Sequence, residues 1–387
     1  MTFELSEAGT LPGDGCAGTL VGRIRLDDGP HVVRVGEDGL HDLSSTFPLM
    51  GELLDHADPA AAAREAKGET LLTLDELLRS TVSDDVGAPR LLAPVDLQAL
   101  KAAGVTFVKS MLERVIEEQA RGDAARALDI RKRVESLIGG DLRSVRPGSD
   151  SALKLKEHLI EQGLWSQYLE VGIGVDAEIF TKAQPMSSVG HGDWIGLHPR
   201  SNWNNPEPEV VLVVSSKGRI VGGTLGNDVN LRDFEGRSAL LLSKAKDNNA
   251  SCSIGPFIRL FDDSFGLDDI RNERVDLEVS GEDGFRLSGS SSMSEISRDP
   301  ADLVEAMMGK AHQYPDGAIL FCGTMFAPTE DRDVEGEGFT HKAGDIVTIA
   351  SRHLGSLVNR VTTSDKAPPW TFGATALTRN LASRGLL

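Results

Sequence analysis

Two glutamates stand two residues apart where the chain enters an apolar run. The segment NNPEPEVVLVV, residues 204–214, carries Glu207 and Glu209 in front of a run of valine and leucine. Side chains at positions i and i+2 of a strand point to the same face of a sheet. The two carboxylates are therefore expected side by side, where they repel each other unless a cation lies between them.

A third carboxylate follows on the next predicted strand. Asp228 comes 21 residues after Glu207, in the segment GGTLGNDVNLRD, and a returning strand would bring it beside the first pair. Three oxygen ligands without His or Cys suit Mg²⁺, Mn²⁺ or Ca²⁺ rather than zinc. Taken singly, both segments are also typical of a solvated strand edge and a charged turn, and these readings stay open at this point.

Composition excludes several classes of function. The 387 residues carry a formal net charge of −19, which argues against nucleic acid and against an anionic membrane surface as partners. The acidic N-terminus has no apolar core, so we expect no signal peptide, and the apolar runs fall far short of the roughly 20 residues that span a bilayer. Three scattered cysteines favour neither disulfides nor a zinc site. We expect a reduced, cytoplasmic protein.

The chain divides into a small N-terminal α+β unit, residues 1–95, and a larger body, residues 96–387. In the first, residues 17–45 alternate as strands around an Asp28-Gly29 hairpin turn, and a helical stretch broken at Pro59 follows. In the second, apolar spacing predicts one long helix from Met111 to Ile138 and another over residues 151–162, within a helical insertion at about 111–165. From there short β-branched runs predict a β-rich body, interrupted by a helix at 300–308.

The order of these motifs resembles the fumarylacetoacetate hydrolase family. That family shows Glu-x-Glu opening a strand, an Asn-Asp-x-x-x-Arg-Asp segment, and a lysine nine residues before Gly-Pro. This sequence has EPEVVLVV, NDVNLRD and KDNNASCSIGP, and later GTMF and HKAGDIVTIASRHLGSLVNRV. The resemblance covers about residues 180–361 and implies a mixed β-roll catalytic domain in an α+β fold.

The resemblance also implies roles for individual residues. Glu207, Glu209 and Asp228 would be metal ligands. Lys246 would be the cationic residue beside the chelated substrate. Apart from the resemblance, we expect its position near the metal to lower its pKa and let it shuttle protons. Thr324 would contact the carboxylate or oxo group of the substrate, and Arg232 and Ser110 are the other two residues expected to contact it.

One segment departs from the pattern. Members that cleave C–C bonds often carry Gly-x-Asn-Tyr-x-x-His, whose His activates water, whereas this chain has GVTFVKS with Ser110 at the His position. His191 and His198 are candidates to replace it, although a structural or surface role suits each of them better. The helical segment that follows resembles the sugar-acid branch, the 2-keto-3-deoxy-pentonate dehydratases. This implies conversion of a pentose-derived 2-keto-3-deoxy acid, from xylose or arabinose, to 2-oxoglutarate semialdehyde.

Dehydration needs proton transfer at carbon and at a leaving hydroxyl. Glu113, one turn into the inserted helix, is the candidate base, with a surface position as the competing interpretation. The main alternative is a C–C hydrolase or decarboxylase acting on acylpyruvates or 2-oxo acids. A non-catalytic binder of 2-oxo acids is the second. The partner is in each case a small 2-keto acid, and the resemblance implies a homodimer or homotetramer.

Overall fold

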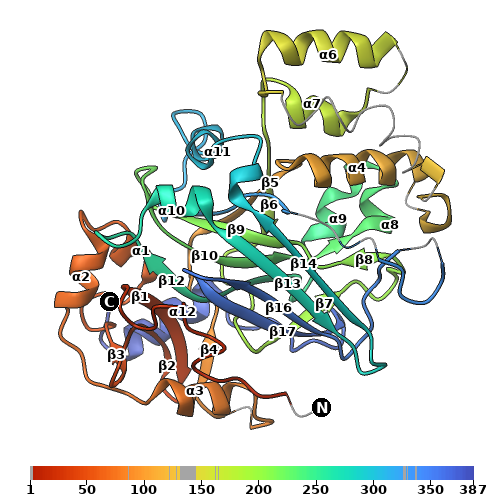
Figure 1. The fold of residues 1–387 in the computed structure, drawn as a ribbon. Helices are drawn as coiled ribbons and strands as arrows, with labels where there is room; N and C mark the ends of the chain where they lie inside the picture. The colour runs from red at the N-terminus through yellow and green to blue at the C-terminus, as the bar shows by residue number, and fades with distance from the viewer. Residues whose placement is uncertain are drawn as a thin grey trace.

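The computed structural model describes residues 3–85, 87–121, 123–127, 129–130, 145–161, 163, 165–325, 328, 330–335 and 338–387. Within these ranges two large sheets and a small two-stranded one form the body, with helices gathered at both ends (Figure 1). This mixed architecture confirms the predicted α+β class. Among the described residues no helix combines the length and apolar character needed to cross a bilayer.

The larger sheet has ten strands and runs through the whole molecule. Its order is β3-β2-β1-β12-β10-β9-β15-β5-β6, and β4 pairs with β1. The strands are β1 (Leu20–Leu26), β2 (Gly29–Gly36), β3 (Gly39–Asp42), β4 (Arg90–Leu92), β5 (Ala99–Gly104), β6 (Glu178–Ala183), β9 (Pro208–Val214), β10 (Ile220–Asp228), β12 (Cys252–Leu260) and β15 (Ala318–Phe321). The strands of the N-terminal unit therefore continue the sheet of the larger body through the antiparallel pair β1–β12.

The second sheet has five strands in the order β14-β13-β16-β17-β7 and packs against the first. Its strands are β7 (Trp194–Leu197), β13 (Arg274–Ser280), β14 (Arg286–Ser292), β16 (Ile346–Ser351) and β17 (Gly355–Thr363). A two-stranded ladder joins β8 (Asn204–Asn205) to β11 (Asn230–Leu231).

Strand β9 shows why its sequence is an unbroken apolar run. Val210, Leu212 and Val214 point into the core between the two sheets. Val211 and Val213 point to the other face, into a core covered by the first helices of the chain. Both faces are buried, so neither tolerates polar residues, and each fully buried Val or Leu stabilises the fold by about 1.5–3 kcal/mol.

Three helical groups surround the sheets (Figure 1). Near the N-terminal strands lie α1 (Met50–Leu54), α2 (Pro59–Glu65), α3 (Leu74–Thr81) and the C-terminal α12 (Ala374–Ser383). At the other end lie α4 (Val108–Ala120), α6 (Asp150–Glu161), α7 (Gln167–Ile173), α8 (Arg232–Glu235) and α9 (Leu242–Lys246). The remaining elements are α10 (Leu267–Asn272), α11 (Pro300–Met307) and the short 3₁₀ turns η2 (Ala239–Leu241) and η3 (Met293–Glu295).

The predicted long helix is wrong in its length. Helix α4 begins at Val108 and ends at Ala120, because Arg121 adopts a left-handed conformation with φ of 57°. A residue in that conformation ends a helix, as a C-terminal glycine commonly does. Residues 131–144, which include the end that was predicted for this helix, lie outside the described residues. The predicted helices at 151–162 and 300–308 are confirmed as α6 and α11.

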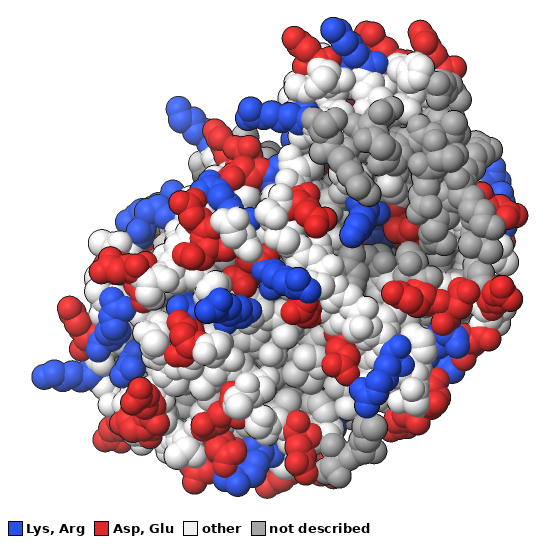
Figure 2. Space-filling model, in the orientation of Figure 1, with Lys and Arg blue, Asp and Glu red and all other residues white. Residues whose placement is uncertain are grey.

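Acidic and basic side chains are interspersed on the face shown in Figure 2. Although the net charge is −19, the acidic side chains do not form one continuous patch on this face.

Candidate metal centre and its cavity

The three predicted carboxylates meet at one end of the β9–β10 pair. Glu209 lies on β9, Asp228 ends β10, and Glu207 immediately precedes β9. The antiparallel register places Glu209 opposite Gly226, and the Asp228 N–H donates to the Glu207 carbonyl at 3.0 Å. One oxygen from each carboxylate lies within 4.8 Å of the others, and all three residues are buried. The prediction that they converge is confirmed.

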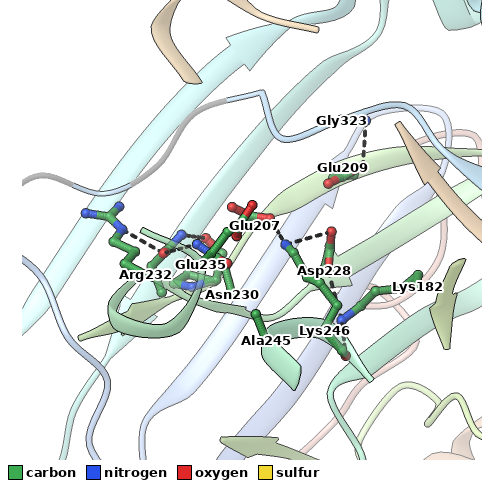
Figure 3. Close-up of polar contacts among 12 residues, drawn as sticks. Lys182, Glu207, Glu209, Asp228, Asn230, Arg232, Glu235, Ala245, Lys246 and Gly323 are labelled. Atoms are coloured by element: carbon green, nitrogen blue, oxygen red, sulfur yellow. Dashed lines mark hydrogen bonds and ion pairs between the residues drawn. The ribbon is translucent and has the colours of Figure 1, made fainter. Parts of the chain in front are cut away.

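Two lysines partly neutralise this cluster (Figure 3). Lys246 Nζ lies 2.7 Å from Glu207 Oε2 and 3.0 Å from Asp228 Oδ2. Lys182 Nζ lies 2.8 Å from Asp228 Oδ1 and donates to the Lys246 carbonyl at 3.0 Å. Burial favours neutral Asp228, but the charges of Lys182 and Lys246 outweigh it and leave the Asp228 pKa below its usual value.

Lys246 does not have the lowered pKa that the sequence suggested. Burial alone would lower the pKa of its ammonium group, but the charges of Asp228 and Glu207 outweigh burial and raise it. Lys246 is therefore a fixed cation in this arrangement of side chains. An electrostatic role beside the carboxylates suits this buried ammonium group better than proton shuttling.

Glu209 is held by a backbone donor. The Gly323 N–H donates to Glu209 Oε2 at 2.7 Å (Figure 3). Gly323 has φ of 98°, and a side chain there would meet Thr106 Oγ1, which itself donates to the Cys322 carbonyl at 2.6 Å. Burial, together with the charges of Asp228 and Glu207, raises the Glu209 pKa well above its usual value. A cation bound at the cluster would offset the free-energy cost of ionising Glu209.

Arg114 is a component that sequence reasoning missed. It reaches from α4 to an ion pair with Glu207, and lies 2.7 Å from Glu117 and 3.3 Å from Glu235. Burial lowers the pKa of its guanidinium, but the charges of Glu117, Glu207 and Glu235 raise it further. In the sequence it is one of several charged residues on a helix, and no spacing marks it as buried.

A small cavity connects these groups. Its volume is about 20 Å³, enough for roughly one water molecule or ion. It is lined by Ala103, Gly104, Val105, Ser110, Arg114, Glu178, Phe180, Glu207, Glu209, Asp228, Glu235, Lys246 and Thr324. A ligand larger than this would need more room than the cavity offers in this arrangement of side chains.

The remaining predicted residues are placed differently. Ser110 and Thr324 line the cavity. Arg232 does not line it: this buried side chain lies 3.3 Å from Glu117 and donates to Asn205 Oδ1 at 2.7 Å. Glu113 is buried, with 9% of its surface exposed, so the interpretation as a surface residue is wrong. It is nevertheless not among the residues that line the cavity.

Neither candidate histidine reaches the cavity. His191 is buried between Thr10 Oγ1, at 3.2 Å, and the Val358 N–H, which donates to Nδ1 at 3.0 Å. Burial lowers its pKa to about 3. His198 packs against Phe234, with ring centroids 5.0 Å apart. Both histidines thus have structural positions, and no imidazole stands among the lining residues to activate water.

Strand β6 supplies a second group that the sequence did not reveal. Glu178, Phe180 and Lys182 alternate along one face of the strand. The first two line the cavity, and the third binds Asp228. In the sequence this segment, EIFTKA, is an ordinary alternating strand, and only the pairing of β6 with β5 shows which face meets the carboxylates.

The donor set fits a hard divalent cation. Five carboxylates line the cavity against two cationic side chains, Arg114 and Lys246. Oxygen-only ligands exclude the thiolate and imidazole chemistry of zinc sites and suit Mg²⁺. Glu207, Glu209 and Asp228 are therefore the residues that would hold it.

Comparison with known proteins supports the same reading. The sequence profile described as "Fumarylacetoacetate (FAA) hydrolase C-terminal" matches residues 152–362, more than half of the chain. A 2-dehydro-3-deoxy-D-arabinonate dehydratase of Saccharolobus solfataricus is 28% identical over 66% of this chain and 86% of its own length. A probable 2-keto-3-deoxyxylonate dehydratase of Haloferax volcanii is 28% identical over 84% of this chain and 92% of its own.

Solved structures agree at the level of the fold. A 2-keto-3-deoxy-D-arabinonate dehydratase complexed with magnesium and 2,5-dioxopentanoate has a TM-score of 0.62 and 22% identity, covering 89% of this chain and 99% of that one. The fold, the order of the motifs and the converging carboxylates agree with one another. The chain belongs to the fumarylacetoacetate hydrolase family.

Proposed function

We propose that this protein is a metal-dependent dehydratase that converts a 2-keto-3-deoxy-pentonate to 2,5-dioxopentanoate, which is 2-oxoglutarate semialdehyde. The observation that carries the proposal is a three-carboxylate site with Lys246 and Thr324 around it and no imidazole among the residues that line its cavity. The two dehydratase relatives support the choice of substrate class.

The site suits a substrate whose carboxylate and 2-keto oxygen lie side by side. When bound, the divalent cation supplies Lewis-acid polarisation of the keto group. Lys246 Nζ, already within 3.0 Å of two of the proposed ligands, adds positive charge beside the keto oxygen as that oxygen becomes negative. Thr324, on the cavity wall, is placed to hydrogen-bond the substrate carboxylate or oxo group.

Chemistry then needs a base at C3 and an acid at the C4 hydroxyl. Removal of a C3 proton gives an enolate, and loss of the C4 hydroxyl as water restores the ketone and leaves a C3–C4 double bond. Loss of a C5 proton, protonation at C3 and ketonisation of the C5 enol give the aldehyde. Glu113 stays the proposed base at C3, and reaching the substrate requires α4 to shift from its present position.

A hydrolase, decarboxylase or tautomerase is the second candidate. An oxaloacetate tautomerase of Rattus norvegicus is 28% identical over 47% of this chain and 58% of its own length. Hydrolysis is disfavoured by Ser110 at the position of the water-activating His and by the remote positions of His191 and His198. A non-catalytic 2-oxo acid binder would not need the proton-transfer groups at the cavity.

The test is product identification. Purified protein with Mg²⁺, and in parallel Mn²⁺ or Ca²⁺, is given both C4 epimers of 2-keto-3-deoxy-pentonate, an acylpyruvate and oxaloacetate. We expect a semialdehyde that an added aldehyde dehydrogenase oxidises to 2-oxoglutarate, and none from Glu207→Gln protein. Stoichiometric pyruvate from the acylpyruvate with the sugar acid untouched would establish the hydrolase instead.

The proposal includes assembly of the chain into a homodimer or homotetramer. Light scattering of the purified protein measures this oligomeric state.

A further inference from the structure

A second and larger cavity lies next to the metal-site cavity. Its volume is about 550 Å³, whereas the metal-site cavity measures about 20 Å³. A volume of this size is typical of sites that receive small molecules. The start of α4, the end of η3 with the two residues after it, and Val145, Arg146 and Met325 form its walls.

The same two segments of chain form walls of both cavities. Phe107 lines the larger cavity, and Ser110, whose hydroxyl donates to the Phe107 carbonyl at 2.9 Å, lines the metal-site cavity. After β15, Thr324 lines the metal-site cavity and the next residue, Met325, lines the larger one. Phe107 and Met325 are each only 1% exposed. The two cavities therefore adjoin, with these two apolar side chains between them.

The charged side chains of the larger cavity favour an anion. Lys109 and Arg146, both exposed, line it together with a single carboxylate, that of Glu295. Within the described ranges no ion pair or hydrogen bond engages either basic side chain. This local excess of positive charge contrasts with the net charge of −19 of the whole chain, which repels an approaching anion. The cavity thus offers an anion a favourable way to the metal site.

We propose that the larger cavity is the entrance chamber of the metal site, in which Lys109 and Arg146 capture the carboxylate of the 2-keto acid before it passes between Phe107 and Met325. The inference rests on the proposed function for the identity of the substrate. The two cations raise the local concentration of the anion and leave the chemical step unchanged. Because exposed charges are screened by salt, their effect depends on ionic strength.

The first test is the double change Lys109→Met and Arg146→Met in the full-length protein with Mg²⁺. At an ionic strength of about 10 mM we expect kcat/KM on 2-keto-3-deoxy-pentonate to fall by about 10-fold, while kcat stays within about 2-fold of wild type. At about 1 M salt, where screening acts within about 3 Å, kcat/KM should approach the wild-type value. The double change Lys217→Met and Lys366→Met removes the same charge from exposed positions outside the chamber and is the matched control. It should keep wild-type kcat/KM at both salt concentrations.

Two further measurements separate capture from a structural effect. Glu295→Lys adds positive charge to the same wall, so it should raise kcat/KM at low ionic strength, which damage to the fold would not do. Oxalate, a small dianion with two adjacent carboxylates, serves as a probe that needs no turnover. Calorimetric titration of the Mg²⁺-loaded protein should show oxalate affinity lowered by about 5-fold or more in the Lys109→Met and Arg146→Met protein at low ionic strength. The Lys217→Met and Lys366→Met protein should bind oxalate as the wild type does.

Failure of this inference and failure of the proposed function give different results. Equal losses in the chamber variant and the control variant, or a loss that persists at high salt, would show that Lys109 and Arg146 do not capture the anion, while the dehydratase stands. Wild-type protein that forms no semialdehyde would overturn the proposed function. A salt-dependent loss of oxalate affinity confined to the chamber variant would then still support the entrance chamber, and unchanged oxalate affinity would overturn it as well.

Discussion

At the scale of single residues, the site is a balance between buried charges. Glu207, Glu209 and Asp228 could be found from the sequence because an i, i+2 pair and a hairpin return are local patterns, and their order along the chain resembles that of a known family. Arg114 and Glu178 could not, because which face of α4 or β6 meets the carboxylates depends on how distant segments pack. The direction in which a buried pKa shifts could not be predicted either. The direction of the Lys246 shift depends on two carboxylates within 3.0 Å of its Nζ.

Replacement of Lys246 by Met should therefore affect both catalysis and stability. We expect kcat to fall by about 10²-fold or more, since a positioned cation at the developing negative charge is lost. Without Mg²⁺ the melting temperature should also fall, because Glu207 and Asp228 lose a buried partner. Added Mg²⁺ should raise it by more than in the wild type. Thermal scans with and without Mg²⁺ measure this, and equal Mg²⁺ increments in both proteins would contradict it.

His191 gives a pH dependence of stability away from the site. Its folded-state pKa of about 3 lies below its ordinary 6.5, so the unfolded chain binds the proton more tightly. This contribution to stability is complete above about pH 6.5 and is lost as pH falls toward 3, with a slope of at most about 1.4 kcal/mol per pH unit. Denaturant unfolding of His191→Gln protein at several pH values should show a flatter slope in this window. If the free energy of unfolding of His191→Gln protein changed with pH as steeply as that of the wild type, groups other than His191 would cause the pH dependence.

At the scale of elements, the β-rich body followed from the sequence and the helical segment did not. Strands such as β9 are short runs of β-branched residues, and such runs predict strands. Both faces of β9 are buried, which explains why its run is apolar throughout. The apolar spacing after Met111 continues past Ala120, yet the helix ends there because of the left-handed Arg121. Short helices such as α8 and α9 were missed, because four or five residues carry too little periodicity.

Helix α4 is tied to the metal ligands by Arg114, which predicts competition with the metal. Arg114→Met should raise Mg²⁺ affinity in calorimetry, since Glu207 no longer has to give up an ion pair. The same change should lower the melting temperature of the metal-free protein, because the buried Glu235 loses this ion pair and Glu117 keeps only Arg232. Lys109→Met, an exposed change on the same helix, is the control and should alter neither. Unchanged or weaker Mg²⁺ binding in Arg114→Met protein would refute the competition.

At the scale of the whole molecule, the boundary predicted at residue 95 is crossed by a continuous sheet. Strands β1 and β12 pair directly, and Arg259 binds Asp14 at 2.7 Å. The C-terminal helix adds a second link, since Asn380 donates to the Asp28 carbonyl at 2.6 Å. Hydrophobic alternation marked the strands near the N-terminus, but it carries no information on the distant strand that pairs with them.

We therefore expect one cooperative unfolding transition for the whole chain. Calorimetry should give a single peak that moves to higher temperature with Mg²⁺, by an amount equivalent to about 2.7 kcal/mol when free Mg²⁺ is 100 times its dissociation constant. The Glu209→Gln protein should show the single peak without the shift. Two separate peaks, one of them insensitive to Mg²⁺, would instead support an N-terminal unit that unfolds independently.

The Gly323 N–H bond to Glu209 has a consequence for the order in which a metal is loaded. Glu207 and Asp228 are engaged by lysine or arginine, which an incoming cation must first dislodge. Glu209 accepts a hydrogen bond from the neutral Gly323 amide through Oε2. A cation that binds its other oxygen, Oε1, does not have to displace a lysine or an arginine. We therefore expect an arriving cation to bind Glu209 first, displacing the proton that its raised pKa retains, and loading to be completed by the slower rearrangement of Arg114 and Lys246.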